Sequence, residues 1–278
     1  MNDDLTLAII GGGNMARALG GGLIGQRCAA RNVHVIDPNP DAQTHWQQIG
    51  CTSSDKPNAT LQEKRVWLFA VKPQIMQDVV KQCKPFLQPD TLIISIAAGI
   101  PASTLAKWFG SASQPHQAIV RAMPNTPALI AHGATGLLAL DGVSDADRAL
   151  VDYLFKIVGQ IVWVDDDQAL DAVTALSGSG PAYVFLFIEA LINGAQALGM
   201  PADQARRLAL ATLDGATELA ALSPESPATL RQQVTSEGGT TAAALNVLEN
   251  HQFSQLIAQA MQAAQKRAAE MATEFSHD

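Results

Sequence analysis

Residues 5–23 read "LTLAIIGGGNMARALGGGL" and combine a short apolar run, a glycine turn and the start of a helical segment. Gly11, Gly13 and Ala16 fit the pattern G-x-G-x-x-G/A. The first glycine of this pattern permits a tight turn, the second lets the backbone approach a pyrophosphate, and the third position keeps the helix close to the strand. The positive end of the helix dipole also favours an anion. The predicted phosphate-binding residues are Gly11, Gly13, Asn14, Met15 and Ala16.

A carboxylate follows this motif at the spacing of a ribose contact. The apolar run "NVHVID" ends in Asp37, 21 residues (37 − 16) after Ala16. A carboxylate at this place accepts hydrogen bonds from a ribose 2′-hydroxyl and repels a 2′-phosphate, so Asp37 favours NADH over NADPH. The alternatives are that Asp37 rotates away or caps the segment after Pro38, and that the glycine turn binds nothing. We expect a bound dinucleotide, either NADPH or NADH.

The composition describes a globular chain that is long enough for two domains. Its 278 residues are 47% hydrophobic and 16% charged, with a net charge of −8. No basic stripe is present to replace the counterions of nucleic acid, so we expect no nucleic-acid partner. The three cysteines are widely spaced and show no metal-ligand pattern, which favours reduced thiols and no metal site. We expect a cytoplasmic protein without membrane contact, because the N-terminus lacks a basic start and the longest apolar helical stretch contains Glu189 and Asn193.

The chain has two halves with different patterns. Apolar runs alternate with helical segments up to residue 164, which predicts an α/β, Rossmann-type doubly wound domain over residues 1–164. The chain then becomes rich in Ala, Leu and Gln, which predicts an all-α dimerisation domain over residues 165–278. The predicted strands are "LTLAII", "NVHVID", "RVWLFAV", "TLIISIA", "AIVRAM", "ATGLLAL" and "QIVWV".

One helical segment of the second half points to a partner chain. The run "YVFLFIEALINGAQAL" at residues 183–198 is apolar nearly all round, which suits a helix enclosed on every side. A helical domain of this size encloses only a small core of its own, so we expect a second copy of the chain to cover it. A helix in the core of a monomer is the alternative.

A second anion site is predicted at residues 231–245, "RQQVTSEGGTTAAAL". Adjacent glycines, Gly238 and Gly239, and two threonines, Thr240 and Thr241, precede a helical segment over residues 242–250. Bare amides and hydroxyls at the positive end of a helix suit a small anion. A threonine-capped helix after a glycine turn is the alternative, but it explains only one residue of each pair.

Six stretches spread along the chain form a recognisable set. They are "GGGNMA" (11–16), "AVKPQ" (70–74), "SIAAGIP" (95–101), "RAMPNTPA" (121–128), "SGSGPAY" (177–183) and "VTSEGGTTAAAL" (234–245). Together they resemble the pyrroline-5-carboxylate reductases. The resemblance implies NAD(P)H-dependent reduction of 1-pyrroline-5-carboxylate to proline, the last step of proline biosynthesis. It also implies a homodimer whose helices interlock, and dimers that can assemble into decamers.

The matched stretches also imply roles for particular residues. Thr241 is the expected catalytic residue, because the resemblance places it to bond the nitrogen of the cyclic imine. Glu237 departs from the family, which usually has proline there, and puts substrate affinity in doubt. Lys72 is either a cofactor contact or a solvated lysine at a strand end. The expected substrate-binding residues are Ser236, Gly238, Gly239, Thr240 and Thr241. The further expected cofactor-binding residues are Asp37, Asn58, Ala70, Val71, Lys72, Pro73, Ala97, Ala98, Gly99 and Asn125, with the small residues 97–99 leaving space for the nicotinamide.

Two rival functions are weaker on these residues. A β-hydroxyacid dehydrogenase needs a catalytic lysine in the helical half, and no lysine lies between Lys156 and Lys266. A non-catalytic nucleotide sensor has no use for the second anion site. Reduction of a protonated imine needs no strong general acid, which agrees with six histidines that all fall outside the motifs.

Overall fold

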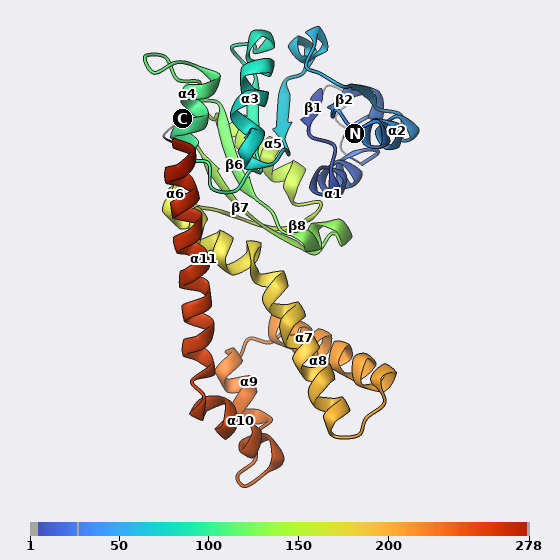
Figure 1. Ribbon diagram of the computed structural model, residues 1–278, viewed down its shortest axis with the longest axis vertical. Helices are drawn as coiled ribbons and strands as arrows, with labels where there is room; N and C mark the ends of the chain where they lie inside the picture. Colours follow the sequence, from blue (N-terminus) through green and yellow to red (C-terminus); the bar gives the residue numbers. More distant parts are fainter. Residues whose placement is uncertain (1–4, 27, 277–278) are drawn as a thin grey trace. The chain divides into compact units, whose positions relative to one another are not determined.

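The computed structural model describes residues 5–26 and 28–276 (Figure 1). By its contacts the chain forms two compact units. Unit 1 contains the chain up to Ser179 together with the residues from Ala263 onward, and unit 2 contains Gly180–Gln262. The last helix therefore begins in unit 2 and ends in unit 1. The domain boundary predicted after residue 164 concerns which parts of the chain fold independently. The contact-based units do not test it, so it stays a prediction.

Unit 1 is built on one eight-stranded sheet of order β3-β2-β1-β4-β5-β6-β7-β8. The strand order reverses between β1 and β4, and open α/β sheets bind ligands at the carboxyl ends of the strands beside such a switch point. All seven predicted strands are present, and β3 is an additional short edge strand whose polar sequence carried no strand signal. The strands are β1 (Leu7–Ile10), β2 (Val33–Ile36), β3 (Thr52–Ser54), β4 (Val66–Phe69), β5 (Leu92–Ser95), β6 (Ile119–Met123), β7 (Gly133–Ala139) and β8 (Gly159–Trp163).

The sheet is not parallel throughout. β7 runs antiparallel to β6, and β8 runs parallel to β7. Only residues 124–132 connect β6 to β7. A parallel crossover needs a dozen or more residues, so this short connection forces the chain to turn back.

Helices cover both faces of the sheet, as expected for a doubly wound domain. Along β1, Leu7 and Ile9 enter a core with α1, α2 and α5, while Ala8 and Ile10 enter a core with α3 and α4. The period-two alternation of strand side chains therefore serves two cores. The helices of unit 1 are α1 (Asn14–Leu23), α2 (Pro40–Gln48), α3 (Pro73–Cys83), α4 (Ala102–Phe109), α5 (Asp145–Phe155) and α6 (Asp167–Val173), with short η1 (Ala30–Asn32), η2 (Ala59–Glu63), η3 (Lys84–Phe86), η4 (Thr126–Ile130) and a π-helical turn η5 (Thr174–Gly178).

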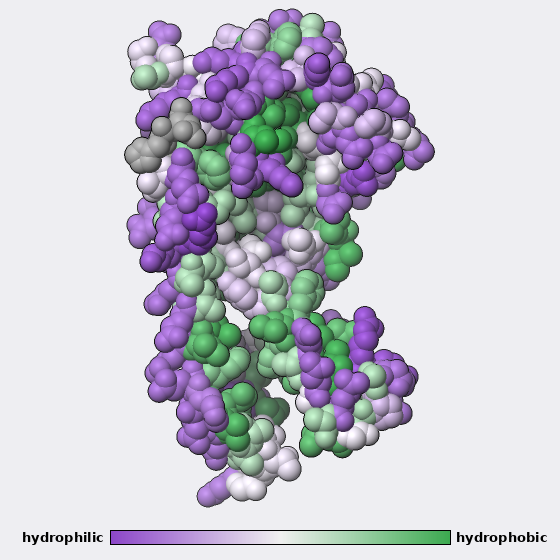
Figure 2. All heavy atoms as spheres, in the orientation of Figure 1, coloured by the Kyte–Doolittle hydropathy of each residue, from purple (hydrophilic) through white to green (hydrophobic). Residues whose placement is uncertain are grey.

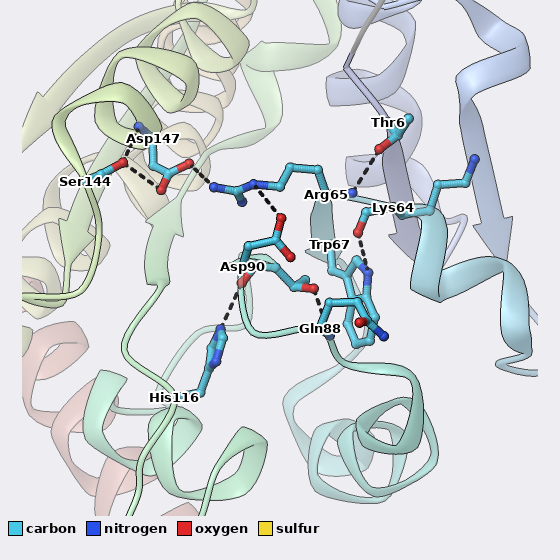
Figure 3. Close-up of polar contacts among 10 residues, drawn as sticks. Thr6, Lys64, Arg65, Trp67, Gln88, Asp90, His116, Ser144 and Asp147 are labelled. Atoms are coloured by element: carbon cyan, nitrogen blue, oxygen red, sulfur yellow. Dashed lines mark hydrogen bonds and ion pairs between the residues drawn. The ribbon is translucent and has the colours of Figure 1, made fainter.

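A polar cluster lies at the amino ends of the strands. Arg65, directly before β4, donates to Asp147 at 2.6 Å and lies 3.8 Å from Asp90 (Figure 3). Ser144 caps α5 by accepting from the amide of Asp147 at 3.1 Å. The cluster joins the loops before β4, β5 and α5. Because it is at the edge opposite the carboxyl ends of the parallel strands, we assign it to fold stability rather than to ligand binding.

Unit 2 is helical, and many of its apolar side chains are exposed. Phe185 and Leu186 are 64% and 68% exposed, and apolar side chains gather on the surface of these helices (Figure 2). The stretch Asp167–Ala197 is long and apolar enough to cross a membrane by length and composition, which on its own is weak evidence. The helices are α7 (Gly180–Ala197), α8 (Ala202–Leu222), α9 (Pro227–Gln233), α10 (Thr240–Asn250) and α11 (Phe253–Ser276).

Candidate active site

The glycine turn after β1 has the geometry that its sequence predicts. Gly11 has φ +96°, and a Cβ there would lie 2.8 Å from the carbonyl carbon and oxygen of Ala70. Only glycine fits this turn. A Cβ at Gly13 would meet no protein atom within 4 Å. The backbone before α1 is therefore bare on the side where a pyrophosphate would approach, so the turn fits a dinucleotide.

Trp46 supports this turn from beneath. Its side chain is fully buried, and its indole Nε1 donates to the carbonyl of Gly12 at 3.2 Å. A Cβ at Gly20 would lie 2.4 Å from the Trp46 ring. Gly20 thus lets α1 lie close to α2, and the indole holds the glycine turn in place.

A cavity of about 680 Å³ lies beside the turn, at the carboxyl ends of β1, β2 and β4. A volume of this order is typical of a small-molecule site. Nine of the predicted cofactor residues do not line it: Asn14, Met15, Ala16, Asn58, Pro73, Ala97, Ala98, Gly99 and Asn125. The Asn58 side chain instead accepts from the amide of Thr60 at 2.9 Å. The predicted residues that do line it are Gly11, Gly13, Asp37, Ala70, Val71 and Lys72.

Asp37 is held at the rim of this cavity by two backbone amides. Its Oδ2 accepts from Gly12 at 2.7 Å, and its Oδ1 accepts from Asn39 at 2.8 Å. The carboxylate therefore ties the glycine turn to the loop after β2 and has not rotated away. Each oxygen keeps a further lone pair for a hydroxyl group.

Lys56 also lines the cavity and was missed by the sequence analysis. It lies in the loop after β3, between Asp55 and Pro57, which line the same cavity. The signal was weak because the short strand that positions this loop was itself missed. Charges of both signs therefore line the cavity: Asp37 and Asp55 are acidic, and Lys56 and Lys72 are basic.

The expectation that Gly99 leaves space for the nicotinamide stays a prediction, and one side of this glycine is already occupied. Gly99 has φ +72°, and a Cβ there would lie 2.7 Å from Cβ of Met271. The space beside Gly99 is filled by α11, which returns to unit 1 far along the chain. Ala97 is buried and Ala98 is half-buried in the same turn after β5.

Asn125 makes its contacts within the protein. Its side chain is buried, its Oδ1 accepts from the amide of Ala134 at 2.8 Å, and its Nδ2 donates to the carbonyl of Ser177 at 3.0 Å. Asn125 was expected to bind the cofactor, and the structure instead shows its side chain bonded to β7 and η5. Its direct contact with the cofactor stays a prediction.

The second predicted anion site forms the start of α10 in unit 2. Gly238 has φ +69°, and Gly239 is the N-cap, with no side-chain hydrogen bond to the cap. The amide of Gly239 donates to the carbonyl of Ser236 at 3.1 Å, so it is not available to a ligand, contrary to expectation. The first amides of a helix have no partner within it, and here they belong to Thr240, Thr241 and Ala242.

The side chains around the start of α10 are exposed or half-buried, so a ligand in solution could reach this site. Thr241 is half-buried, while Ser236, Glu237 and Thr240 are exposed. A Cβ on Gly239 would lie 2.5 Å from Oγ of Ser236. A side chain at Gly239 would displace the Ser236 hydroxyl, so the second glycine has a packing role within this turn.

Several buried or half-buried titratable groups of unit 1 serve the fold rather than a ligand site. Arg121, buried on β6, pairs with Asp167 at the start of α6, and burial raises the pKa of Asp171 on the same helix. Burial raises the pKa of Cys83 to about 12 and that of Cys51 to about 11, so neither thiol is a ready nucleophile. The buried His34 bonds Thr52 at 2.8 Å and Ser54 at 3.0 Å.

Two family descriptions match this chain. Residues 167–271 match "Pyrroline-5-carboxylate reductase dimerisation", and residues 6–99 match "NADP oxidoreductase coenzyme F420-dependent". The first covers the helical part of the chain and the second covers the glycine turn and its cavity. The chain thus carries a dimerisation domain and a dinucleotide-binding domain of known type.

Known proteins match over nearly the whole length. The pyrroline-5-carboxylate reductase of Pseudomonas aeruginosa is 42% identical over 270 residues, which cover 97% of each chain. The structure of a pyrroline-5-carboxylate reductase from Coxiella burnetii matches with a TM-score of 0.88 at 36% identity, covering 97% of this chain and 99% of that one. The Plasmodium falciparum pyrroline carboxylate reductase with NADP bound matches with a TM-score of 0.86 at 29% identity, covering 97% and 99%. This chain belongs to the pyrroline-5-carboxylate reductase family.

Proposed function

We propose that this protein catalyses the NAD(P)H-dependent reduction of 1-pyrroline-5-carboxylate to L-proline, the last step of proline biosynthesis. The observation that carries the proposal is the second anion site at the start of α10, in a chain that also has the glycine turn and its cavity. A dehydrogenase that acts on another substrate would need the dinucleotide site at the glycine turn. It would not need the free amides at the start of α10, which directly follow "SEGG".

The glycine turn and α1 hold the pyrophosphate of the cofactor in this proposal. The bound cofactor supplies the hydride. The bare backbone at Gly13 allows close approach, and Asp37 accepts hydrogen bonds from a ribose hydroxyl. Ala70, Val71 and Lys72 form the wall at the end of β4. Ala97 and Ala98 are proposed to lie on the nicotinamide side.

The amides of Thr240, Thr241 and Ala242 bind the substrate carboxylate in this proposal. Three N–H groups and the helix dipole offset the negative charge without a basic side chain. Thr241 adds a hydroxyl, which we assign to the ring nitrogen. When the imine nitrogen arrives protonated, no strong general acid is required, and a hydroxyl suffices to orient it.

We further propose that NADH is the preferred cofactor. Asp37 is fixed at the cavity rim by two amides, so it cannot swing away from a 2′-phosphate without breaking both bonds. The positive charge of Lys56 offsets part of the negative charge of Asp37, so we expect NADH to be preferred without NADPH being excluded. The related Plasmodium protein has NADP bound, so a measured preference for NADPH would place this chain with that relative.

The partner and location are proposed from the same features. The exposed apolar side chains of unit 2 suit a homodimer, and dimers can assemble further into a decamer. A cytoplasmic location is supported by cysteines that are buried and unpaired. A dimer would also explain the apolar surface of Asp167–Ala197 without a membrane.

The experiment is to follow oxidation of NADH and of NADPH by absorbance with 1-pyrroline-5-carboxylate as substrate. Turnover with proline as product supports the reductase, and the ratio of the two kcat/KM values tests the role of Asp37. Binding of both nucleotides without turnover would contradict the proposal and favour a nucleotide sensor.

A further inference from the structure

The loop after β6 and the π-helical turn η5 are bonded to each other within unit 1. Asn125 of the first donates its Nδ2 to the carbonyl of Ser177 in the second at 3.0 Å. The same side chain accepts from the amide of Ala134 on β7 at 2.8 Å. One buried amide group thus joins three segments that are up to 52 residues apart in sequence.

The sequence after Ser177 explains why this bond matters. In a regular α-helix the Ser177 carbonyl would accept from the amide four residues later, but that residue is Pro181, which has no N–H. Asn125 donates to this half-buried carbonyl from a segment outside the helix.

A second contact joins the same two segments. A Cβ on Gly178 would lie 2.7 Å from Cε of Met123, so Met123 packs directly on the bare backbone of Gly178. The residues "MPN" at 123–125 and "SG" at 177–178 therefore form one packed substructure, with an apolar contact beside a polar one. π-helical turns of this kind are often found at functional sites.

The substructure is also linked to the dinucleotide turn. The short helix η4 begins directly after Asn125 and packs against α1, which is the helix that follows the glycine turn. A displacement of Asn125 would shift η4 against α1 and release the backbone of Ser177 and Gly178 at the same time. The loop after β6 leaves the sheet at the carboxyl end of a parallel strand, the edge at which ligands bind in this fold.

We propose that Asn125 is a positioning residue for hydride transfer, acting through the backbone of the loop after β6 and of η5 rather than as a ligand of the cofactor. Each polar end of its side chain bonds a protein group, and the side chain is buried, so these bonds fix it toward β7 and η5. The inference rests on the proposed reductase function. It predicts that loss of the Asn125 bonds lowers the rate of the chemical step while the nucleotide still binds.

The test compares Asn125→Asp and Asn125→Ala with the unchanged protein. The aspartate keeps an acceptor for Ala134 but cannot donate to Ser177 when ionised, whereas the alanine loses both bonds. Because Asn125→Ala removes both bonds to half-buried groups, it is the variant at greater risk of misfolding. Gly178→Ala is the second route, since it disturbs the Met123 contact through a flexible side chain. Thermal unfolding establishes which variants are folded.

The readouts are the Kd of NADH and NADPH, kcat, KM and the primary isotope effect with cofactor deuterated at the transferred position. We expect unchanged nucleotide Kd values, a kcat lower by about 10–100-fold for Asn125→Asp, and a larger isotope effect as hydride transfer becomes rate-limiting. Gly178→Ala should change kcat in the same direction by a smaller factor.

Three results would overturn the inference. A nucleotide Kd that rises in step with the loss of kcat would make Asn125 a cofactor ligand. A lower melting temperature with kcat and isotope effect unchanged would make its role purely structural. Absence of turnover by the unchanged protein would refute the reductase function itself and the inference with it.

Discussion

Gly13→Ala separates the cofactor role of the glycine turn from its role in the fold. Gly13 has φ −73° and ψ −168°, which alanine adopts without strain. Its added methyl would meet no protein atom within 4 Å, so the fold should lose about 1 kcal/mol or less from the poorer N-cap. The methyl would instead occupy the approach of the pyrophosphate. Loss of one charge-assisted hydrogen bond costs about 1.5–3 kcal/mol, or about 10–100-fold in Kd.

The matched control is Gly21→Ala in the same helix. Gly21 is exposed, and its added methyl also meets nothing within 4 Å, but it lies in the helix interior. It should raise the free energy of unfolding by about 1 kcal/mol and leave nucleotide affinity unchanged. Titration of NADH by fluorescence and urea unfolding measure both quantities. Equal Kd values for Gly13→Ala and the unchanged protein would refute the assignment of this turn to the pyrophosphate.

Three further predictions test other parts of the molecule. Asp37→Ser should raise the NADPH-to-NADH ratio of kcat/KM by about tenfold, because it removes a repulsion of about 1 kcal/mol or more from the 2′-phosphate; an unchanged ratio would show that Asp37 does not select the cofactor. Gly239→Ala should displace Ser236, whose Oγ would lie 2.5 Å from the new methyl, and raise KM for 1-pyrroline-5-carboxylate with unchanged nucleotide Kd; an unchanged KM would remove the substrate from this helix start. Burial lowers the pKa of His34 and of His116 below the ordinary 6.5. As the pH falls below about 6.5 the unfolded state therefore binds protons before the folded state does, and the free energy of unfolding should decrease. Urea midpoints that stay level or rise in acid would contradict this, and His34→Gln should make the decrease smaller.

Local chain chemistry explains why much of the fold was predictable. The run before Gly11 forms a strand, the turn needs a glycine with positive φ, and the helix begins at Asn14. Each of these depends on neighbouring residues, so a linear pattern contains the information. The helix start after Gly238 and Gly239 was predicted for the same reason, although α10 begins at Thr240 rather than at residue 242.

The misses depend on segments far apart in sequence. The strand β3 is short and polar and exists because it pairs with β2, so its own residues carry no signal. Lys56 reaches the cavity only because β3 positions the loop that holds it. The antiparallel direction of β7 follows from a short connection whose length is visible but whose consequence requires the neighbouring strand.

The sequence alone determined the class of the protein, a dinucleotide-binding domain followed by a helical domain, and it predicted two anion sites, because glycine turns and helix starts are local features. Only the tertiary structure decided how three predicted residues are used. The space beside Gly99 belongs to Met271, the amide of Gly239 is spent on Ser236, and the side chain of Asn125 joins β7 to η5. A side chain or amide binds whichever partner the fold brings within about 3 Å, and that partner can be any distance away along the chain.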